Sequence, residues 1–319
     1  MKWIKRGLIF DPTNHNLDFK WTEYAQSPQT IVYDDFVRIY FSTRKRDKSG
    51  KFTSHVAFVD FNQGFTQIIN HSESEVIPLG TIGCFDEHGI FPFNPLRNEN
   101  KILAFTCGWS RRISVPVETS TGLAVSDDNG ITFKKIGKGP VFTSSIKEPM
   151  LVGDSFVKVY DGIFHMWYIY GKYWLKADGN EPEARVYKIS HATSNDGITW
   201  ERREGEQIID DNIGVNECQA LPTVIKLENK YHMFFCYRYA TGFRENPKRS
   251  YKLGYAHSKD LKSWQRDDTN KGIDVSKSGW DSEMMCYPHL FEAFGKVYLL
   301  YNGNIFGKYG FGLAELASL

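Results

Sequence analysis

Glutamates recur in this sequence at a fixed distance ahead of a proline. Four of them stand five residues before one, so that Glu23, Glu87, Glu217 and Glu283 precede Pro28, Pro92, Pro222 and Pro288. In a fifth segment Ser155 takes the place of the proline, and Asp154 directly precedes it. Carboxylates held close together shift one another's pKa values, so one can donate a proton while another stays ionised as a base or nucleophile. Cleavage of a glycosidic bond uses such a pair.

These carboxylates are the candidate catalytic residues. With the neighbouring aspartate included, the set is Glu217, Glu87, Asp86, Glu283 and Asp154. We expect an acid from Glu217 or Glu283 and a base from Asp86 or Glu87, with Asp154 tuning or orienting. The alternative is structural, because glutamates repeated at equivalent positions can accept hydrogen bonds from backbone N–H groups where each strand begins.

Basic, aromatic and amide side chains lie in the same parts of the chain. Arginine forks match the geometry of carboxylates and phosphates, and flat aromatic rings can stack on sugar rings. The candidate substrate-binding residues are Arg44, Trp109, Arg111, Arg238, Arg244, Asn302, Asn304 and His88. The arginines would suit an anionic sugar, or they would pair with the glutamates.

The elements that must position these residues form an internal repeat. The proline marks and Ser155 follow one another at steps of 64, 63, 67 and 66 residues. Each mark lies in an apolar strand that is followed by a short polar turn and a second, aromatic strand. A third strand and a fourth come next, joined by turns such as Asp-Asn-Gly. Four antiparallel strands per repeat predict an all-β, five-bladed β-propeller that forms one domain over residues 1–319.

The two ends of the chain complement each other. The last repeat stops after its third strand, Phe311–Leu316, and lacks a fourth. The first residues, Trp3–Phe10, resemble the fourth strands of other repeats. We therefore expect the N-terminal strand to pair beside the C-terminal one and close the ring, which leaves no open sheet edge.

The long loops are predicted to gather on one face. In each repeat the second and third strands are joined by a long segment, and antiparallel order brings these segments to the end where the first strand begins. They span residues 44–54, 108–120, 171–185, 237–250 and 302–310. Binding sites commonly lie on long loops carried by a rigid scaffold, so we expect the site at this mouth.

Composition argues against several partners. Lys and Arg number 39 and Asp and Glu 38, so there is no broad charge footprint for nucleic acid or a membrane surface. No apolar run is long enough to span a bilayer, and the first ten residues do not form a signal peptide. Five cysteines without a CxxC spacing suggest reduced thiols in a cytoplasmic protein.

No metal site or cofactor is expected from the motifs. Cysteines and histidines near the starts of the first strands match no zinc spacing. The chain has no P-loop, no GxGxxG after a strand and no GxSxG elbow. A Ca²⁺ ion in the central channel is conceivable, but nothing in the sequence identifies one.

The turn motif Ser194–Trp200, with a variant over Ser126–Phe133, and the repeated prolines resemble those of the five-bladed glycoside hydrolases. These are the arabinanase, levansucrase and invertase superfamily, with families 43, 32, 68 and 130. Segments 279–291 and 301–312 resemble bacterial propellers that have no assigned activity. The likeness covers the whole chain as architecture.

The resemblance also implies residue roles, which this chain fulfils in part. In family 43 an aspartate acts as base directly before the first-repeat mark, where this chain has Ser27. The family's third-repeat aspartate, which tunes the acid, falls on Asp154. The family's acid glutamate falls on Ala220, three residues after Glu217.

The resulting expectation is a glycoside hydrolase-like enzyme that acts on a sugar or sugar conjugate through carboxylates at the mouth. Two alternatives stay open because Ser27 and Ala220 leave the family's triad incomplete. One is a non-catalytic carbohydrate-binding propeller. The other is a phosphorylase of the family 130 kind, which would use the mouth arginines for phosphate.

Overall fold

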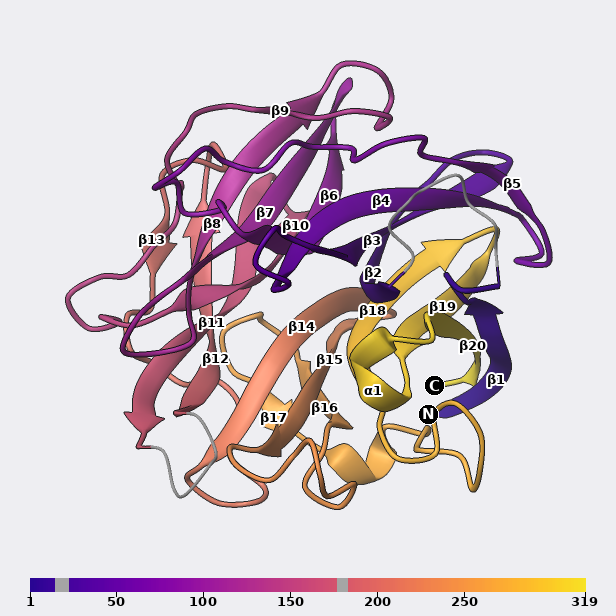
Figure 1. The fold of residues 1–319 in the computed structure, drawn as a ribbon. Coiled ribbons are helices and arrows are strands. Elements are labelled where there is room, and N and C mark those ends of the chain that lie inside the picture. Colours follow the sequence, from indigo (N-terminus) through magenta and orange to yellow (C-terminus); the bar gives the residue numbers. More distant parts are fainter. Residues whose placement is uncertain (15–22, 177–182) are drawn as a thin grey trace.

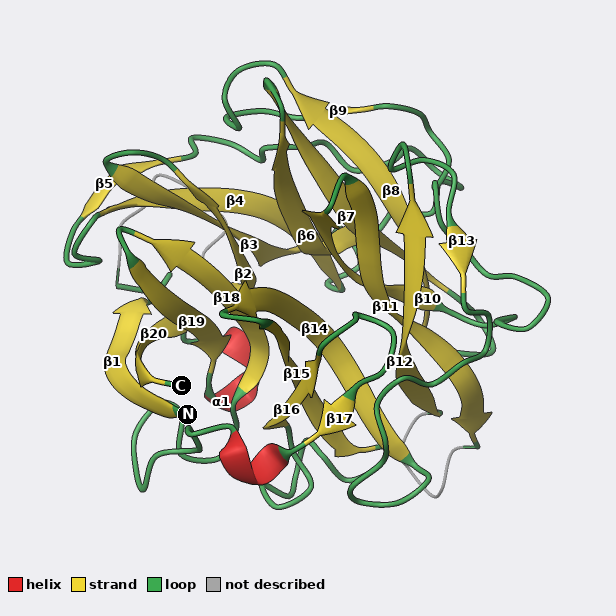
Figure 2. Ribbon diagram, turned by 180° about the vertical axis from the view of Figure 1, so that it is seen from behind, coloured by secondary structure: helices red, strands yellow, loops and turns green. Residues whose placement is uncertain are grey.

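The structure is a computed structural model that describes residues 1–14, 23–176 and 183–319. The part of the long 171–185 loop over residues 177–182 therefore lies outside the described residues. The regular secondary structure of the described chain consists almost entirely of antiparallel strands (Figures 1 and 2). None of its helices is long and apolar enough to cross a membrane. The predicted all-β class is confirmed.

The strands follow one another in repeated groups, each named here after its first strand. The β2 group holds β2 (Glu23–Val32), β3 (Phe36–Arg46), β4 (Phe52–Asn62) and β5 (Ile68–His71). The β6 group holds β6 (Gly89–Asn98), β7 (Lys101–Arg111), β8 (Val117–Ser126) and β9 (Lys134–Lys135). A single parallel residue pair, Ser54 with Gly89, links these two groups into one sheet.

The remaining groups are separate four-stranded sheets. The β10 group holds β10 (Val152–Tyr160), β11 (Ile163–Leu175), β12 (Ala184–Ser194) and β13 (Glu201–Arg202). The β14 group holds β14 (Glu217–Leu227), β15 (Lys230–Tyr239), β16 (Lys252–Ser258) and β17 (Gln265–Arg266). The short helix η1 (Asp268–Asn270) follows β17.

The last sheet joins both ends of the chain. It contains β18 (Cys286–Ala293), β19 (Lys296–Asn302) and β20 (Phe311–Ser318), with the short turn α1 (Asn304–Gly307) between β19 and β20. Its outer strand is β1 (Lys2–Phe10), which pairs antiparallel with β20 from Lys2 opposite Ser318 to Phe10 opposite Phe311. The two termini consequently lie side by side in both views (Figures 1 and 2). The predicted pairing of the two end segments is confirmed.

The first strands contact one another in a closed order. Contacts join β2 to β6, β6 to β10, β10 to β14, β14 to β18, and β18 back to β2. The N-terminal ends of these strands and the loops between second and third strands share one face, which we call the mouth face. Figure 1 shows the molecule from the side on which α1, one of these loops, faces the viewer.

Aromatic side chains fill the space between neighbouring groups. Tyr40 of the β2 group lies 5.3 Å from Phe93 of the β6 group, measured between ring centroids. Phe105 and Trp200 meet at 5.8 Å between the next two groups. Trp3 of β1 lies edge-on to Phe234 of the β14 group at 5.7 Å. Burying each such ring contributes about 1.5–3 kcal/mol, which explains the high aromatic content.

The Ser–Asp–Gly turn motif has a structural role. In the turn after β12, Asp196 Oδ1 accepts hydrogen bonds from the backbone N–H groups of Ile198 and Thr199. These bonds lower the pKa of Asp196 to about 2. Trp200 Nε1–H donates to the Gly197 carbonyl at 3.2 Å. The motif that carries the family resemblance therefore fixes a turn between third and fourth strands.

Candidate functional site

Each first strand is interrupted at the same point by a β-bulge. The register with the second strand shifts at the mark of every repeat, between Gln26 and Gln29 and at the equivalent places in β6, β10, β14 and β18. Proline suits this position because a bulge frees the backbone from donating to the ladder. The repeated prolines of the sequence therefore mark bulges.

The residue before each mark has an unusual backbone conformation. We call these the bulge residues: Ser27, Phe91, Asp154, Leu221 and Tyr287. Four have a positive φ between 48° and 56°, and the peptide bond between Phe91 and Pro92 is cis. A non-glycine residue with positive φ costs roughly 1–3 kcal/mol, and such strain clusters at functional sites. Only one bulge residue, Asp154, carries an ionisable carboxyl group.

Asp154 lies in a weakly solvated place at the mouth end of β10. Burial raises the pKa of its carboxyl group to about 7, although the Arg185 guanidinium and the Leu221 backbone N–H lower it. The backbone N–H of Asp154 donates to Cys107 Sγ at 3.3 Å. A carboxyl group with a pKa near 7 is half protonated at neutral pH. That pKa suits a general acid.

Arg185 acts on Asp154, and two further arginines lie near Arg185; we call the three the arginine cluster: Arg185, Arg238 and Arg244. Arg185 is near the start of β12, Arg238 near the end of β15, and Arg244 is in the loop between β15 and β16. Desolvation lowers the pKa of Arg244, and repulsion from the other two guanidiniums lowers it further. The three positive charges are therefore close enough to repel one another.

Arg238 is the buried member of the cluster, with 4% of its surface exposed. One of its Nη atoms donates to the carbonyls of Tyr239 and Ala240, and the other donates to the Tyr187 hydroxyl at 3.0 Å. Its Nε atom is buried and has no partner among the described residues. The guanidinium lies 3.6 Å from the centre of the Phe243 ring.

Tyrosine hydroxyl groups line the approach to these arginines. Tyr187 and Tyr251 share a hydrogen bond of 2.7 Å between their hydroxyl oxygens. Tyr287, a bulge residue, packs against Tyr251 at 5.7 Å and against Phe91 at 5.2 Å. Burial raises the pKa of Tyr287, and Arg44 lowers it from the other side. Tyr187 and Tyr251 thus pack around Arg238, and Tyr287 extends this aromatic wall.

None of these arginines is paired with an acidic side chain in the described part of the chain. Within residues 1–14, 23–176 and 183–319, no ion pair within 4 Å involves Arg44, Arg185, Arg238 or Arg244. Arg44 instead donates to Gln26 Oε1 at 2.8 Å and lies over the Tyr24 ring at 4.6 Å. The expected pairing of mouth arginines with glutamates is therefore not observed for Arg44, Arg238 or Arg244 among the described residues.

Two predicted catalytic carboxylates belong to a different set. In each of four strand groups, a buried carboxylate near the start of the first strand pairs with a cation on the fourth strand, and we call these pairs the strand clamps. They are Asp86–Lys135, Glu148–Arg202, Glu217–Arg266 and Asp281–Lys5. In the last clamp the cation comes from β1, which occupies the place of a fourth strand.

Glu217 is fully engaged in its clamp. Its Oε1 accepts from Arg266 at 2.6 Å and from Gln219 at 3.0 Å. Its Oε2 accepts from the backbone N–H groups of Asn212 and Ile213 at 2.8 and 3.0 Å. The structural alternative for the repeated glutamates therefore fits Glu217. Asp86 is also buried and forms an ion pair with Lys135, but its two carboxylate oxygens accept no hydrogen bond from the described residues.

Glu87 and His88 lie with Trp109 and Arg111 on another part of the mouth face. Glu87 accepts from the Gly83 backbone N–H at 3.0 Å, and His88 stacks on Trp109 at 5.9 Å. Arg111 is fixed by Asp47 Oδ2 at 2.7 Å and by the Phe52 carbonyl at 2.7 Å. A cavity of about 640 Å³ lies beside Glu87 and Arg111. Arg111 is thus held by protein partners, whereas Glu87 is partly exposed.

The predicted residues of the last sheet differ in exposure. Glu283 is exposed. Asn304 holds the adjacent chain by accepting from the Glu283 and Met284 backbone N–H groups. Asn302 is fully buried, donates to the Ala25 and Gly310 carbonyls at 2.7 Å, and accepts from the Ser27 N–H at 2.8 Å. Both asparagines therefore have structural contacts that connect mouth segments.

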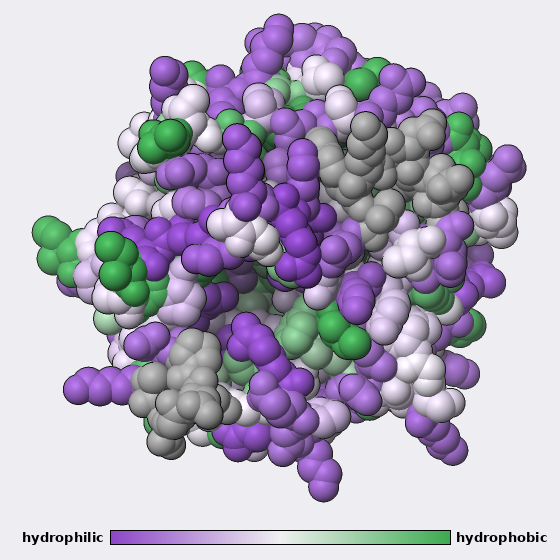
Figure 3. Space-filling model, in the orientation of Figure 1, coloured by the Kyte–Doolittle hydropathy of each residue, from purple (hydrophilic) through white to green (hydrophobic). Residues whose placement is uncertain are grey.

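Figure 3 shows the mouth face in the orientation of Figure 1, with hydrophilic side chains around a hollow near its middle. Sequence reasoning identified Asp154, Arg44, Arg238 and Arg244 in this region but missed Arg185, Tyr187, Tyr251 and Tyr287. For Tyr287 the sequence carried a signal in its position: Tyr287 immediately precedes Pro288, just as Asp154 precedes Ser155.

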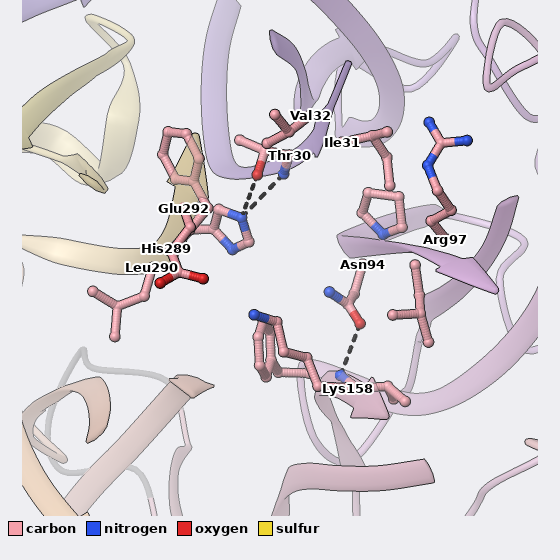
Figure 4. A pocket seen from close by; sticks show the side chains of 14 residues that line it. Thr30, Ile31, Val32, Asn94, Arg97, Lys158, His289, Leu290 and Glu292 are labelled. Atoms are coloured by element: carbon pink, nitrogen blue, oxygen red, sulfur yellow. Dashed lines mark hydrogen bonds between the residues drawn. The ribbon is translucent and has the colours of Figure 1, made fainter. Parts of the chain in front are cut away.

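A second pocket, of about 320 Å³, lies at the other end of the first strands (Figure 4). His289 Nε2 accepts from the Thr30 backbone N–H at 3.1 Å, so Nδ1 carries the proton, and Nδ1 has no partner among the described residues. Burial and the nearby Lys158 lower the pKa of His289 to about 3.

No group of three or more metal-ligating side chains occurs within residues 1–14, 23–176 and 183–319.

Comparison with known sequences gives two relatives that match over nearly their whole length. They are the proteins "Uncharacterized protein MT1551" and "Uncharacterized protein Rv1502" of Mycobacterium tuberculosis. Each is 30% identical to this chain over 316 residues. The match covers 99% of this chain and 99% of each relative. No protein-family model matches the chain.

Solved structures with a similar fold include glycoside hydrolases and a phosphorylase. A protein named only as "Glycoside hydrolase" has a TM-score of 0.72 at 15% identity, over 99% of this chain and 92% of that one. The β-1,2-mannobiose phosphorylase of Listeria innocua has a TM-score of 0.68 at 11% identity, over 99% of this chain and 96% of the phosphorylase. The endo-arabinase of Bacteroides thetaiotaomicron has a TM-score of 0.63 at 11% identity, over 98% of this chain and 99% of the endo-arabinase. The fold resemblance predicted from the sequence is confirmed.

Proposed function

The chain belongs to the same family as the Mycobacterium tuberculosis proteins Rv1502 and MT1551, and we propose that it is a sugar-acting enzyme whose proton-donating carboxyl group is Asp154. The observation that carries this proposal is the raised pKa of Asp154, about 7, on a strained bulge at the mouth face. The fold likeness to glycoside hydrolases and a phosphorylase supports it. The ligand is accordingly a carbohydrate or sugar conjugate.

The proposed architecture is a single five-bladed propeller over residues 1–319, closed by β1. The closed order of contacts among the first strands and the pairing of β1 with β20 support this arrangement. The clamp between Asp281 and Lys5 supports it independently, because β1 supplies the cation that a fourth strand supplies elsewhere. A cytoplasmic location remains our proposal, supported by the absence of disulfides among the five cysteines.

Asp154 would act on the glycosidic oxygen. In its protonated form it donates the proton to the leaving oxygen as the bond to the anomeric carbon breaks. Cys107 and the Leu221 backbone hold the bulge, and burial limits the contact of the carboxyl group with water. This assigns to Asp154 the acid role that the sequence analysis gave to Glu217 or Glu283. Of the five predicted carboxylates, Glu217 and Asp86 are the two buried in clamps.

The nucleophile distinguishes two versions of the reaction. In a hydrolase, a second carboxyl group such as that of Glu87 or Glu283 would activate water as the base. In a phosphorylase, phosphate itself attacks, and a single carboxylic acid is sufficient. The unpaired arginines near Asp154 favour the second version specifically, since they would hold the phosphate. A binding protein without turnover is the remaining alternative.

The test is a screen of nitrophenyl glycosides and oligosaccharides with and without phosphate, followed by Asp154→Asn on any substrate found. We expect the variant to lose about 10²–10⁴-fold in kcat, because general acid catalysis contributes that much. Wild-type kcat should fall above pH 7 as Asp154 ionises. Asp161→Asn, at an exposed turn, is the matched control and should keep full activity. Unchanged turnover in Asp154→Asn would refute the assignment.

A further inference from the structure

The arginine cluster carries positive charge that the described chain does not neutralise. Arg238 is almost completely buried, and a buried charge without a partner is costly unless a counter-ion accompanies it. In contrast, the largely buried side chains of Arg266 and Arg202 are paired with carboxylates at 2.6 and 3.2 Å. Among the described residues, the protein therefore pairs these structural arginines with carboxylates and leaves the arginine cluster without such a partner.

The donors of the cluster are positioned by neutral groups. Tyr187 and the carbonyls of Tyr239 and Ala240 orient Arg238 without cancelling its charge. The Arg238 Nε–H remains a buried donor with no partner among the described residues. Phe243 packs against Arg238 at 3.6 Å and against Arg244 at 4.3 Å, so one ring holds two guanidiniums together.

The cluster contains three guanidiniums whose charges repel one another. A carboxylate neutralises one positive charge, whereas a phosphate group carries up to two negative charges and offers three acceptor oxygens. A doubly charged oxyanion therefore complements the cluster better. The nearby Asp154 adds no more than one negative charge, and its pKa near 7 leaves it half neutral at pH 7.

We propose that Arg185, Arg238 and Arg244 form a binding subsite for a phosphate-type oxyanion, carried either by the sugar substrate as a phosphate ester or by free phosphate. This inference rests on the proposed function for its location beside the reacting bond. It names the substrate class, because a sugar with a phosphate group would be placed by the cluster with its glycosidic oxygen at Asp154. It also gives Arg185, which the sequence analysis overlooked, a substrate-binding role.

The test measures binding directly by calorimetry, with inorganic phosphate, glucose 6-phosphate, glucose and glucuronate as separate probes. We expect glucose 6-phosphate or phosphate to bind, and glucose to show no binding. Arg244→Gln and Arg185→Gln should each weaken that binding about tenfold, the loss expected for one charge-assisted contact. Arg97→Gln, which removes one arginine at the opposite pocket, is the matched control and should bind like the wild type.

The outcomes distinguish a phosphate ester on the sugar from free phosphate as the source of the oxyanion. They also distinguish the oxyanion subsite from the proposed enzyme activity. Tighter binding of the ester than of phosphate assigns the oxyanion to the substrate, and the reverse order assigns it to free phosphate. Binding that persists in Asp154→Asn while turnover is lost supports both proposals. Oxyanion binding in a protein that cleaves no glycoside retains the subsite and refutes the enzyme. If neither phosphate probe binds, or if Arg244→Gln and Arg185→Gln bind as well as the wild type, the subsite is refuted.

Discussion

At the scale of single residues, the functional candidates are those that the fold leaves uncompensated. Burial raises the pKa of Asp154 to about 7 despite the nearby Arg185 guanidinium, while Glu217 accepts four hydrogen bonds in its clamp. Arg238 has a buried Nε without a partner among the described residues, while Arg266 is paired with two carboxylates. Residue type alone does not separate these roles, but their contacts do.

Asp154 should also make the protein less stable as pH rises. Its pKa is about 7 in the folded chain and 3.8 in the unfolded one, so the folded state binds more protons between these values. Stability is therefore expected to fall as pH rises through this window, by about 1.4 kcal/mol for each unit of pKa difference. Asp154→Asn lacks this titration and should unfold at higher denaturant concentration than the wild type at pH 8, with a smaller gap at pH 5.

Urea unfolding at both pH values measures this difference. Asp161→Asn serves as the control, because Asp161 is exposed in the turn between β10 and β11. A gap between Asp154→Asn and the wild type that is the same at pH 5 and pH 8 would contradict the raised pKa.

At the scale of elements, the first strand of each group and its bulge account for much of the site. The proline spacing predicted where these strands lie, and the end segments predicted as Trp3–Phe10 and Phe311–Leu316 are observed as Lys2–Phe10 and Phe311–Ser318. The strand clamps were not predictable in the same way. Glu217 meets Arg266 across a whole sheet, and no local spacing indicates that pairing.

The mouth arginines illustrate the same limit. Arg238 and Arg244 stand in a loop that was expected to bind, yet nothing local shows that they lack acidic partners. Arg185 follows a loop with no periodic pattern, and its closeness to Asp154 depends on how the β10 group is folded. Asp154 itself was predictable because it precedes the repeat mark. The local sequence pattern thus identified the position of Asp154 on its strand. The charges around Asp154 and the arginines depend on how the sheets assemble.

The clamp at Glu217 gives a prediction at this scale. Glu217→Gln removes the charge that balances the buried Arg266, although Asp268 still contacts that arginine at 2.9 Å. Breaking a buried pair costs about 3–5 kcal/mol when no second partner is left, so we expect a loss at or below the low end of that range. Differential scanning calorimetry should show a Tm several degrees lower.

Glu283→Gln is the matched control for the clamp. Glu283 stands at the same distance before Pro288 as Glu217 does before Pro222, but it is exposed. Its Tm should equal that of the wild type. An unchanged Tm in Glu217→Gln, together with lost turnover, would return Glu217 to the catalytic role.

At the scale of the whole molecule, β1 holds the two ends of the chain in one sheet. It contributes Trp3 and Phe10 to the core and Lys5 to the clamp with Asp281. Without β1, the β20 strand would present an unpaired edge, which favours association between molecules.

Deletion of residues 1–10 should therefore cause association as well as a loss of stability. Size-exclusion chromatography should show larger species that the full chain does not form, and the Tm should fall. Lys5→Met, which keeps the strand and removes only the charge of the clamp, is the matched comparison and should lower the Tm without association. A truncated chain that stays monomeric and keeps the wild-type Tm would contradict the role given to β1.

The pairing of β1 with β20 also has a consequence for biosynthesis. Strand β1 is translated long before β20, which is its hydrogen-bonding partner. At 5–20 residues per second, β1 waits roughly 15–60 s for that partner. During this time Trp3 and Phe10 have no finished sheet to enter, so the nascent β1 segment is open to chaperones and proteases. The sheet that holds β1 can be completed only after β20 has been translated, and any delay in the release of β20 from the ribosome should prolong that exposure.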